Sequence, residues 1–262
     1  MTSRPGSWRI LQQSVLGTAH LRDQLPCQDF CLAVLTRPAE EEFLVAACAD
    51  GAGSAELSQE GARIACTRIV QLVCRDLQAG LVADQIDRAQ FVDWFRSVRA
   101  AIEEEAQARQ VLSRQLACTL LVVVAGSSTT AVAQLGDGAI VVRGTDGFVA
   151  AFWPQTGEFL NLTHFVTDDT FERAMEVAKL GRVDEVAMMT DGLQMLALDY
   201  AKRVPHQQFF RPMFDALRAS DAPDELLVPF RRFLDSPQVN DKTDDDKTLV
   251  VATRLTDAVA AG

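Results

Sequence analysis

The feature that most constrains the fold of this chain is a strand-dense stretch between residues 117 and 153. It contains the apolar segments ACTLLVVVA, TTAVAQLGDGAIVVR and GFVAAFW. The short sequences GSS and GTDG separate these segments, and GDG interrupts the second one. Short turns of Gly and Asp between apolar segments are typical of hairpins, in which consecutive strands pair in opposite directions. The stretch therefore predicts an antiparallel β-sheet.

Periodicity on either side of this stretch predicts further elements. The apolar run FLVAACA at 43–49 predicts a buried strand that ends at an Asp-Gly pair. Helical spacing of apolar residues predicts helices over 59–77, 88–110, 206–218 and 223–234. Ser58 is the expected N-cap of the first of these helices.

The chain contains no linker rich in Pro, Gly or Ser and no repeat of fixed period. We therefore expect residues 1–262 to form a single domain with its core at 14–255. The polar, turn-rich sequence at 153–172 is expected to form an ordered loop or flap over part of that domain.

The formal charge of −11 argues against a nucleic-acid partner, because phosphate backbones are bound by basic surfaces. No apolar segment approaches the roughly 20 residues that cross a bilayer, and the start of the chain lacks the apolar core of a signal peptide. Six scattered cysteines in such a chain are expected to be free thiols. These features predict a cytoplasmic protein that associates with neither nucleic acid nor membrane.

Four aspartates border the predicted strands: Asp50 in ADGAG, Asp137 in LGDGA, Asp191 in TDGL and Asp245 in DDDKT. Each alone is explained as a turn residue, because an aspartate readily hydrogen-bonds its own backbone in an Asp-Gly turn. Strands of a sheet sandwich can, however, bring their ends to one edge. Carboxylates gathered there repel one another unless cations compensate, and oxygen ligands without His or Cys favour Mg²⁺ or Mn²⁺.

An ordered series of motifs extends this hypothesis. It comprises QDF at 28–30, ADGAGSA at 49–55, CTLLVVV at 118–124, QLGDGAIVV at 134–142, MTDGL at 189–193 and DDKTLVV at 245–251. The series resembles the PP2C-type (PPM) metal-dependent Ser/Thr protein phosphatases, and a divergent bacterial branch of them in particular. The resemblance implies an α+β fold, a four-layer α-β-β-α sandwich with two central antiparallel β-sheets.

The resemblance also implies roles for individual residues. Asp50 matches the aspartate that bridges two metal ions, and the Gly51 carbonyl matches a ligand of the second metal. Asp191 and Asp245 match the remaining carboxylates of the first metal, and Asp137 matches a turn that in some members helps to hold a weaker third metal. Two further residues correspond to groups near the metals that do not bind them directly, Asp29 and Gln28.

The implied activity is hydrolysis of phosphoserine and phosphothreonine in proteins by water activated between two divalent cations, Mn²⁺ or Mg²⁺. The implied partners are a phosphorylated protein substrate and a cognate Ser/Thr kinase or its target. Two alternatives stay open: a pseudophosphatase that acts as a regulatory binding module, and a Mg²⁺-dependent phosphoesterase for small molecules.

Three positions depart from the family pattern. Ala52 replaces a histidine that many members use to protonate the leaving group, and Met195 replaces an aspartate of the third metal site. Gln24 replaces the arginine that grips the substrate phosphate, so Arg22 and His20 are the candidates for that role.

Overall fold

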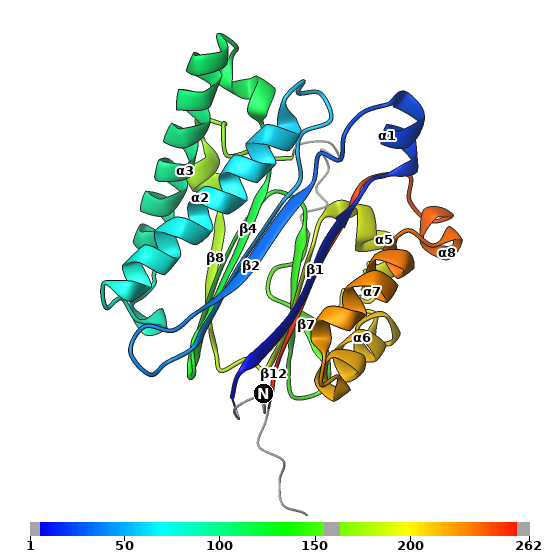
Figure 1. Cartoon of the computed structure of the whole chain (residues 1–262). Coiled ribbons are helices and arrows are strands. Elements are labelled where there is room, and N and C mark those ends of the chain that lie inside the picture. Colours follow the sequence, from blue (N-terminus) through cyan, green and yellow to red (C-terminus); the bar gives the residue numbers. More distant parts are fainter. Residues whose placement is uncertain (1–5, 155–162, 256–262) are drawn as a thin grey trace, which may run out of the picture.

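Two five-stranded antiparallel sheets lie face to face at the centre of the computed structural model, which describes residues 6–154 and 163–255 (Figure 1). The first sheet has the order β1-β12-β9-β6-β7, formed by β1 (Trp8–Val15), β12 (Lys247–Arg254), β9 (Glu185–Met189), β6 (Ala139–Arg143) and β7 (Phe148–Ala150). The second has the order β2-β3-β4-β5-β8, formed by β2 (Phe30–Thr36), β3 (Phe43–Ala49), β4 (Leu120–Ala125), β5 (Thr129–Leu135) and β8 (Glu176–Gly181). A short hairpin pairs β10 (Leu198–Asp199) with β11 (Val204–Pro205).

Helices cover both outer faces of this sandwich. The long helices α2 (Ser58–Gln78) and α3 (Arg88–Arg109) lie over the second sheet, and α6 (Gln207–Ala219) and α7 (Leu227–Leu234) lie over the first (Figure 1). The described residues also form shorter helical turns: α1 (Thr18–Asp23), α4 (Phe171–Ala174), α5 (Gln194–Ala197), α8 (Pro237–Asn240), η1 (Ala83–Gln85), η2 (Ser113–Leu116), η3 (Asp191–Leu193) and η4 (Pro223–Leu226). The predicted α-β-β-α sandwich is confirmed.

Alternation along the strands builds three apolar layers. In β3, Phe43, Val45 and Ala47 face α2 and α3, whereas Leu44 and Ala46 face the other sheet. Every residue of β3 is buried, because both faces of its sheet are covered. This explains why FLVAACA is a continuous apolar run rather than an alternating one.

Most predicted elements match the structure within one or two residues, but the helix cap at Ser58 is wrong. Ser58 is the first residue of α2, and its side chain makes no capping hydrogen bond. The side chain is fully buried against the loop after β3, where a Cβ added to Gly51 would lie 2.7 Å from Ser58 Cβ. Close packing of the helix on that loop therefore takes the place of a polar cap.

Two other expectations are limited by what the structure describes. Within the predicted flap at 153–172, residues 155–162 lie outside the described residues, and 163–172 form turns that lead into α4. Among the described helices, none is both long and apolar enough to cross a membrane.

Candidate metal centre

Strand register brings the acidic turns to one edge of the sandwich. In the second sheet, Phe30 pairs with Ala49, so Asp29 and Asp50 leave the sheet side by side. In the first sheet, Met189 pairs with both Ala139 and Leu249, which places the loops of Asp191, Asp137 and Asp245 next to one another. The predicted convergence of the strand ends is therefore present.

A cavity of about 310 Å³ lies at this edge. Its lining includes four aspartates from four different loops: Asp50, Asp137, Asp191 and Asp245. Gly51, Ala52 and Gly53 form part of its wall, together with His20, Gln28, Thr163 and Phe165. The cavity thus brings together most of the residues that the sequence singled out. The potential metal ligands among them are mainly carboxylate oxygens.

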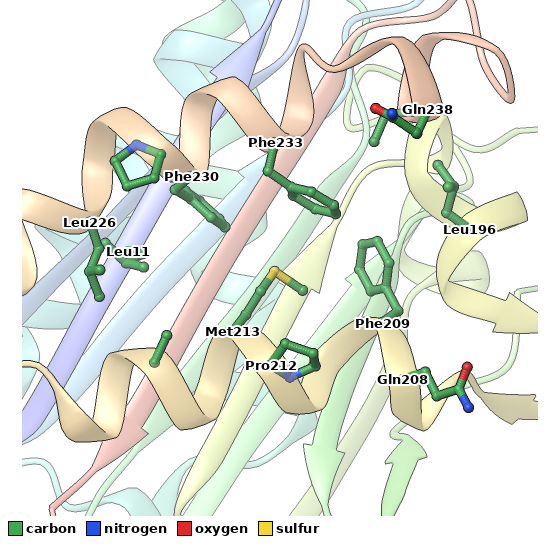
Figure 2. A pocket seen from close by; sticks show the side chains of 13 residues that line it. Leu11, Leu196, Gln208, Phe209, Pro212, Met213, Leu226, Phe230, Phe233 and Gln238 are labelled. Carbon is green, nitrogen blue, oxygen red and sulfur yellow. The ribbon is translucent and has the colours of Figure 1, made fainter.

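A second cavity, of about 390 Å³, lies between α6 and α7 and has a different character. Figure 2 shows Phe209 and Met213 of α6 facing Phe230 and Phe233 of α7, and the polar side chains in its lining are those of two glutamines, Gln208 and Gln238. A lining without carboxylates or imidazoles offers little to a hydrated cation. The acidic cavity is therefore the candidate centre.

Three of the aspartates are close enough to share an ion. Carboxylate oxygens of Asp50, Asp137 and Asp191 all lie within 4.8 Å of one another. Burial raises the pKa of Asp191 to about 6, and the charges of Asp137 and Asp245 add to the effect. Burial also raises the pKa of Asp50 well above its usual value, helped by repulsion from Asp29, Asp191 and Asp245. Such a cluster favours binding of a positive charge.

Asp245 and Asp29 complete the acidic environment. Burial raises the pKa of Asp245, whose Oδ1 accepts a 2.7 Å hydrogen bond from the Asp246 backbone N–H. Asp29 is buried, its pKa is raised mainly by that burial, and its Oδ2 accepts a 2.7 Å hydrogen bond from the Thr190 hydroxyl. Asp29 does not line the cavity, so it lies behind the aspartates that do.

The residues present fit a divalent cation. Beside the carboxylates, Gln28 lines the cavity and is 5% exposed as a residue, and its Oε1 has no hydrogen-bond partner among the described residues. A buried amide oxygen without a partner is costly unless an ion or an ordered water satisfies it. Oxygen ligands of this kind suit Mg²⁺ or Mn²⁺.

Asp246 is the important residue that the sequence reasoning did not single out. It is 2% exposed, its Oδ1 accepts from Gly17 N–H and its Oδ2 from Gln28 N–H, both at 2.6 Å. Asp246 therefore ties the start of β12 to the segment that carries α1. The signal was present in the sequence DDDKT, in which three successive aspartates cannot all point to the same side of the chain.

The two candidates for phosphate binding lie in different environments. His20 lines the cavity, and its Nδ1 lies 3.0 Å from Asp246 Oδ2 without the alignment of a hydrogen bond. Arg22 is 68% exposed, does not line the cavity, and has its Nε 3.7 Å from Asp23 Oδ1. Gln24, at the position of the expected arginine, is the C-cap of α1 with a φ of 58°.

The other departures from the family pattern are also explained by their surroundings. Ala52 is 8% exposed and packs with Ala55, Ala117 and Phe165, so apolar groups surround its methyl group. Met195 is 72% exposed and does not line the acidic cavity. Neither side chain supplies a polar group to the site.

The described part of the predicted flap is fastened to α3. Arg99 donates to the Asp168 carbonyl at 2.8 Å and to the Asp169 carboxylate at 2.7 Å. From the same segment Phe165 and Thr163 reach the cavity, where the Thr163 hydroxyl donates to Asp137 Oδ2 at 2.7 Å. The segment thus forms one wall of the acidic cavity.

An antiparallel α-β-β-α sandwich with aspartates gathered at one edge defines a class of metal-dependent phosphatases, and comparison with known proteins agrees. The family model described as protein phosphatase 2C matches residues 16–229. The chain is 36% identical over 250 residues to serine/threonine-protein phosphatase 3 of Escherichia coli (strain K12). This match covers 94% of this chain and 98% of that relative. The chain belongs to the protein phosphatase 2C family and is a serine/threonine protein phosphatase.

Solved structures support the fold. A crystal structure of a bacterial serine phosphatase matches 97% of this chain and 100% of its own, with a TM-score of 0.62 and 11% identity. A crystal structure of RsbX in complex with magnesium matches 96% of this chain and 98% of its own, with a TM-score of 0.55 and 12% identity. Together, the family match and the Escherichia coli relative favour the phosphatase over the two alternatives that the sequence left open.

Proposed function

We propose that this phosphatase works with two divalent cations, Mg²⁺ or Mn²⁺, held by the carboxylates of Asp50, Asp191 and Asp245 and by the Gly51 carbonyl. The observation that carries the proposal is the convergence of buried carboxylates, whose pKa values are raised, on one cavity. Asp137 belongs to the same group by distance, so we assign it a direct part in cation binding. A structural neighbour that was crystallised with magnesium supports the choice of ion.

Bound cations of this kind lower the pKa of water and neutralise charge on a transferring phosphoryl group. The residues of the chain then have distinct tasks. Asp29 and Thr190 support the acidic cluster from behind, and Gln28 lines the same cavity with a buried amide oxygen that has no hydrogen-bond partner among the described residues. Phe165 and the apolar groups around Ala52 keep bulk water away from one side of the site.

The substrate class follows from the family: a protein that carries phosphoserine or phosphothreonine. We further propose that the substrate is a cognate Ser/Thr kinase or a target of one, and that the whole chain acts as one phosphatase domain with its core at 14–255. The cytoplasmic location stays a prediction from the sequence. Comparing the phosphoproteomes of cells with and without the gene tests the substrate, because enriched phosphoserine or phosphothreonine sites are expected in its absence.

The enzymatic part is tested by phosphate release from a phosphothreonine peptide, with Mn²⁺, with Mg²⁺ or with EDTA. We expect activity with either ion and none in EDTA, and a large loss in Asp245→Asn with saturating Mn²⁺. Undiminished activity in EDTA contradicts the assignment of cations. Nucleotides and sugar phosphates serve as competitors, since faster hydrolysis of these small molecules contradicts the substrate class.

A further inference from the structure

Release of serine or threonine from phosphate requires a proton, because an alkoxide is a poor leaving group. Position 52 cannot supply one, since Ala52 carries only a methyl group that packs against Phe165. Among the described residues that line the acidic cavity, the carboxylates are assigned to cations, and Gln28 and Thr163 have no readily ionised proton. His20 contributes the one imidazole of that lining.

The ring of His20 lies beside a buried carboxylate. The residue lies on α1, its side chain is 16% exposed, and its Nδ1 lies 3.0 Å from Asp246 Oδ2. Asp246 is itself immobilised by the backbone N–H groups of Gly17 and Gln28, both 2.6 Å from its carboxylate oxygens. The segment is tied down again by the Ala19 N–H, which donates to the Asp244 carbonyl at 2.8 Å. A fixed carboxylate this close to Nδ1 leaves Nε2 as the ring nitrogen available to a substrate.

We propose that His20, held beside Asp246, is the general acid of this phosphatase. The proposal rests on the proposed function. As the oxygen of a water molecule forms its bond to phosphorus, the bond between phosphorus and the serine or threonine oxygen breaks. The electron pair of that bond stays on the leaving oxygen, which takes the proton from Nε2 of the charged imidazole. The attacking water gives one proton to solvent, and solvent returns one proton to His20 before the next turnover.

The leaving group tests this role directly, because p-nitrophenolate leaves as a stable anion and needs no proton. With saturating Mn²⁺, His20→Gln should lower kcat for a phosphothreonine peptide by about 10²- to 10³-fold. Hydrolysis of p-nitrophenyl phosphate by the same variant should change by less than about fivefold, since general-acid assistance is dispensable there. The matched control is His206→Gln, which makes the same change at an exposed residue and should alter neither rate.

Two results overturn the proposal. Equal losses on both substrates assign His20 to phosphate binding or to structure, and no loss on either substrate removes it from the chemistry. Should His20→Gln fold poorly, His20→Ala with added imidazole gives the second measurement: imidazole should restore peptide hydrolysis without accelerating p-nitrophenyl phosphate. A wild-type protein that is inactive on both substrates with Mn²⁺ and Mg²⁺ contradicts the proposed function instead, so the two failures are distinguishable.

Discussion

The carboxylates of Asp50 and Asp191 meet although their strands belong to different sheets. Asp50 follows β3 of the second sheet and Asp191 follows β9 of the first, yet carboxylate oxygens of the two side chains lie within 4.8 Å of each other. The pair brings the two sheets together at the acidic edge. It also stores repulsion that a bound cation relieves, which links cation binding to stability.

The first prediction concerns this pair. Asp50→Asn and Asp191→Asn should each lower phosphopeptide hydrolysis by at least about 10³-fold, because each removes a charge that holds the activating cation. Initial rates with Mn²⁺ measure the effect. Asp93→Asn is the matched control, since Asp93 is an exposed aspartate on α3 far along the chain from these loops and should leave the rate unchanged. A rate within tenfold of wild type in either site variant contradicts the assignment.

The second prediction is a pH dependence of stability without metal. Because the pKa of Asp191 is raised from 3.8 to about 6 in the folded protein, the folded state binds that proton more tightly than the unfolded state. The stability that this group contributes is present below about pH 4 and is lost as the pH rises through 6. In EDTA, the free energy of unfolding of wild type should fall by on the order of 1–3 kcal/mol relative to that of Asp191→Asn between pH 4 and pH 7.5.

Urea unfolding of both proteins at several pH values measures this difference. At pH 7.5, saturating Mn²⁺ should make wild type more stable than Asp191→Asn, since the ion stabilises only the protein that binds it. A stability difference that stays constant from pH 4 to pH 7.5 in EDTA would show that the Asp191 carboxyl is not perturbed by folding.

The third prediction concerns Asp246. Asp246→Ala leaves the N–H groups of Gly17 and Gln28 buried without their carboxylate partner. We expect a loss of about 2–5 kcal/mol in the free energy of unfolding, because two hydrogen bonds to a charged acceptor disappear at once. Urea unfolding in EDTA isolates this effect from metal binding. A loss below about 0.5 kcal/mol, typical of a surface substitution, argues against the tethering role.

The fourth prediction tests the wall formed by residues 163–172. Arg99→Ala removes the hydrogen bonds from α3 to Asp168 and Asp169, so the segment that carries Phe165 is held less firmly. If the looser segment weakens substrate binding by about 1 kcal/mol, KM for a phosphopeptide should rise roughly fivefold. Arg63→Ala, which breaks an exposed pair with Glu60 on α2, is the control and should change KM little. An unchanged KM in Arg99→Ala would assign these contacts to stability alone.

Much of the fold and of the site follows from local sequence. The strand at 43–49 and the helix at 88–110 were predicted nearly to the residue, because continuous burial and helical periodicity are local signals. Asp50, Asp191, Asp137 and Asp245 were assigned to one edge from their positions at strand ends, and all four line the same cavity.

What the sequence missed depends on contacts between distant segments. The buried position of Ser58 against Gly51 and the tether from Asp246 to Gly17 and Gln28 join residues that only the fold brings together. The exposure of Arg22 and the approach of His20 to Asp246 likewise depend on how α1 lies over the site. Motif spacing carries no information about these contacts.

We propose that Asp50 and its neighbours bind the cations on which catalysis depends, and calorimetric titration of Mn²⁺ tests this binding most directly. At pH 7.5 the wild-type chain should bind two ions, and Asp50→Asn should lose both or bind them at least about 100-fold more weakly, because a charged ligand is removed from the cluster. Binding of two ions by Asp50→Asn with the affinity of wild type would contradict the account.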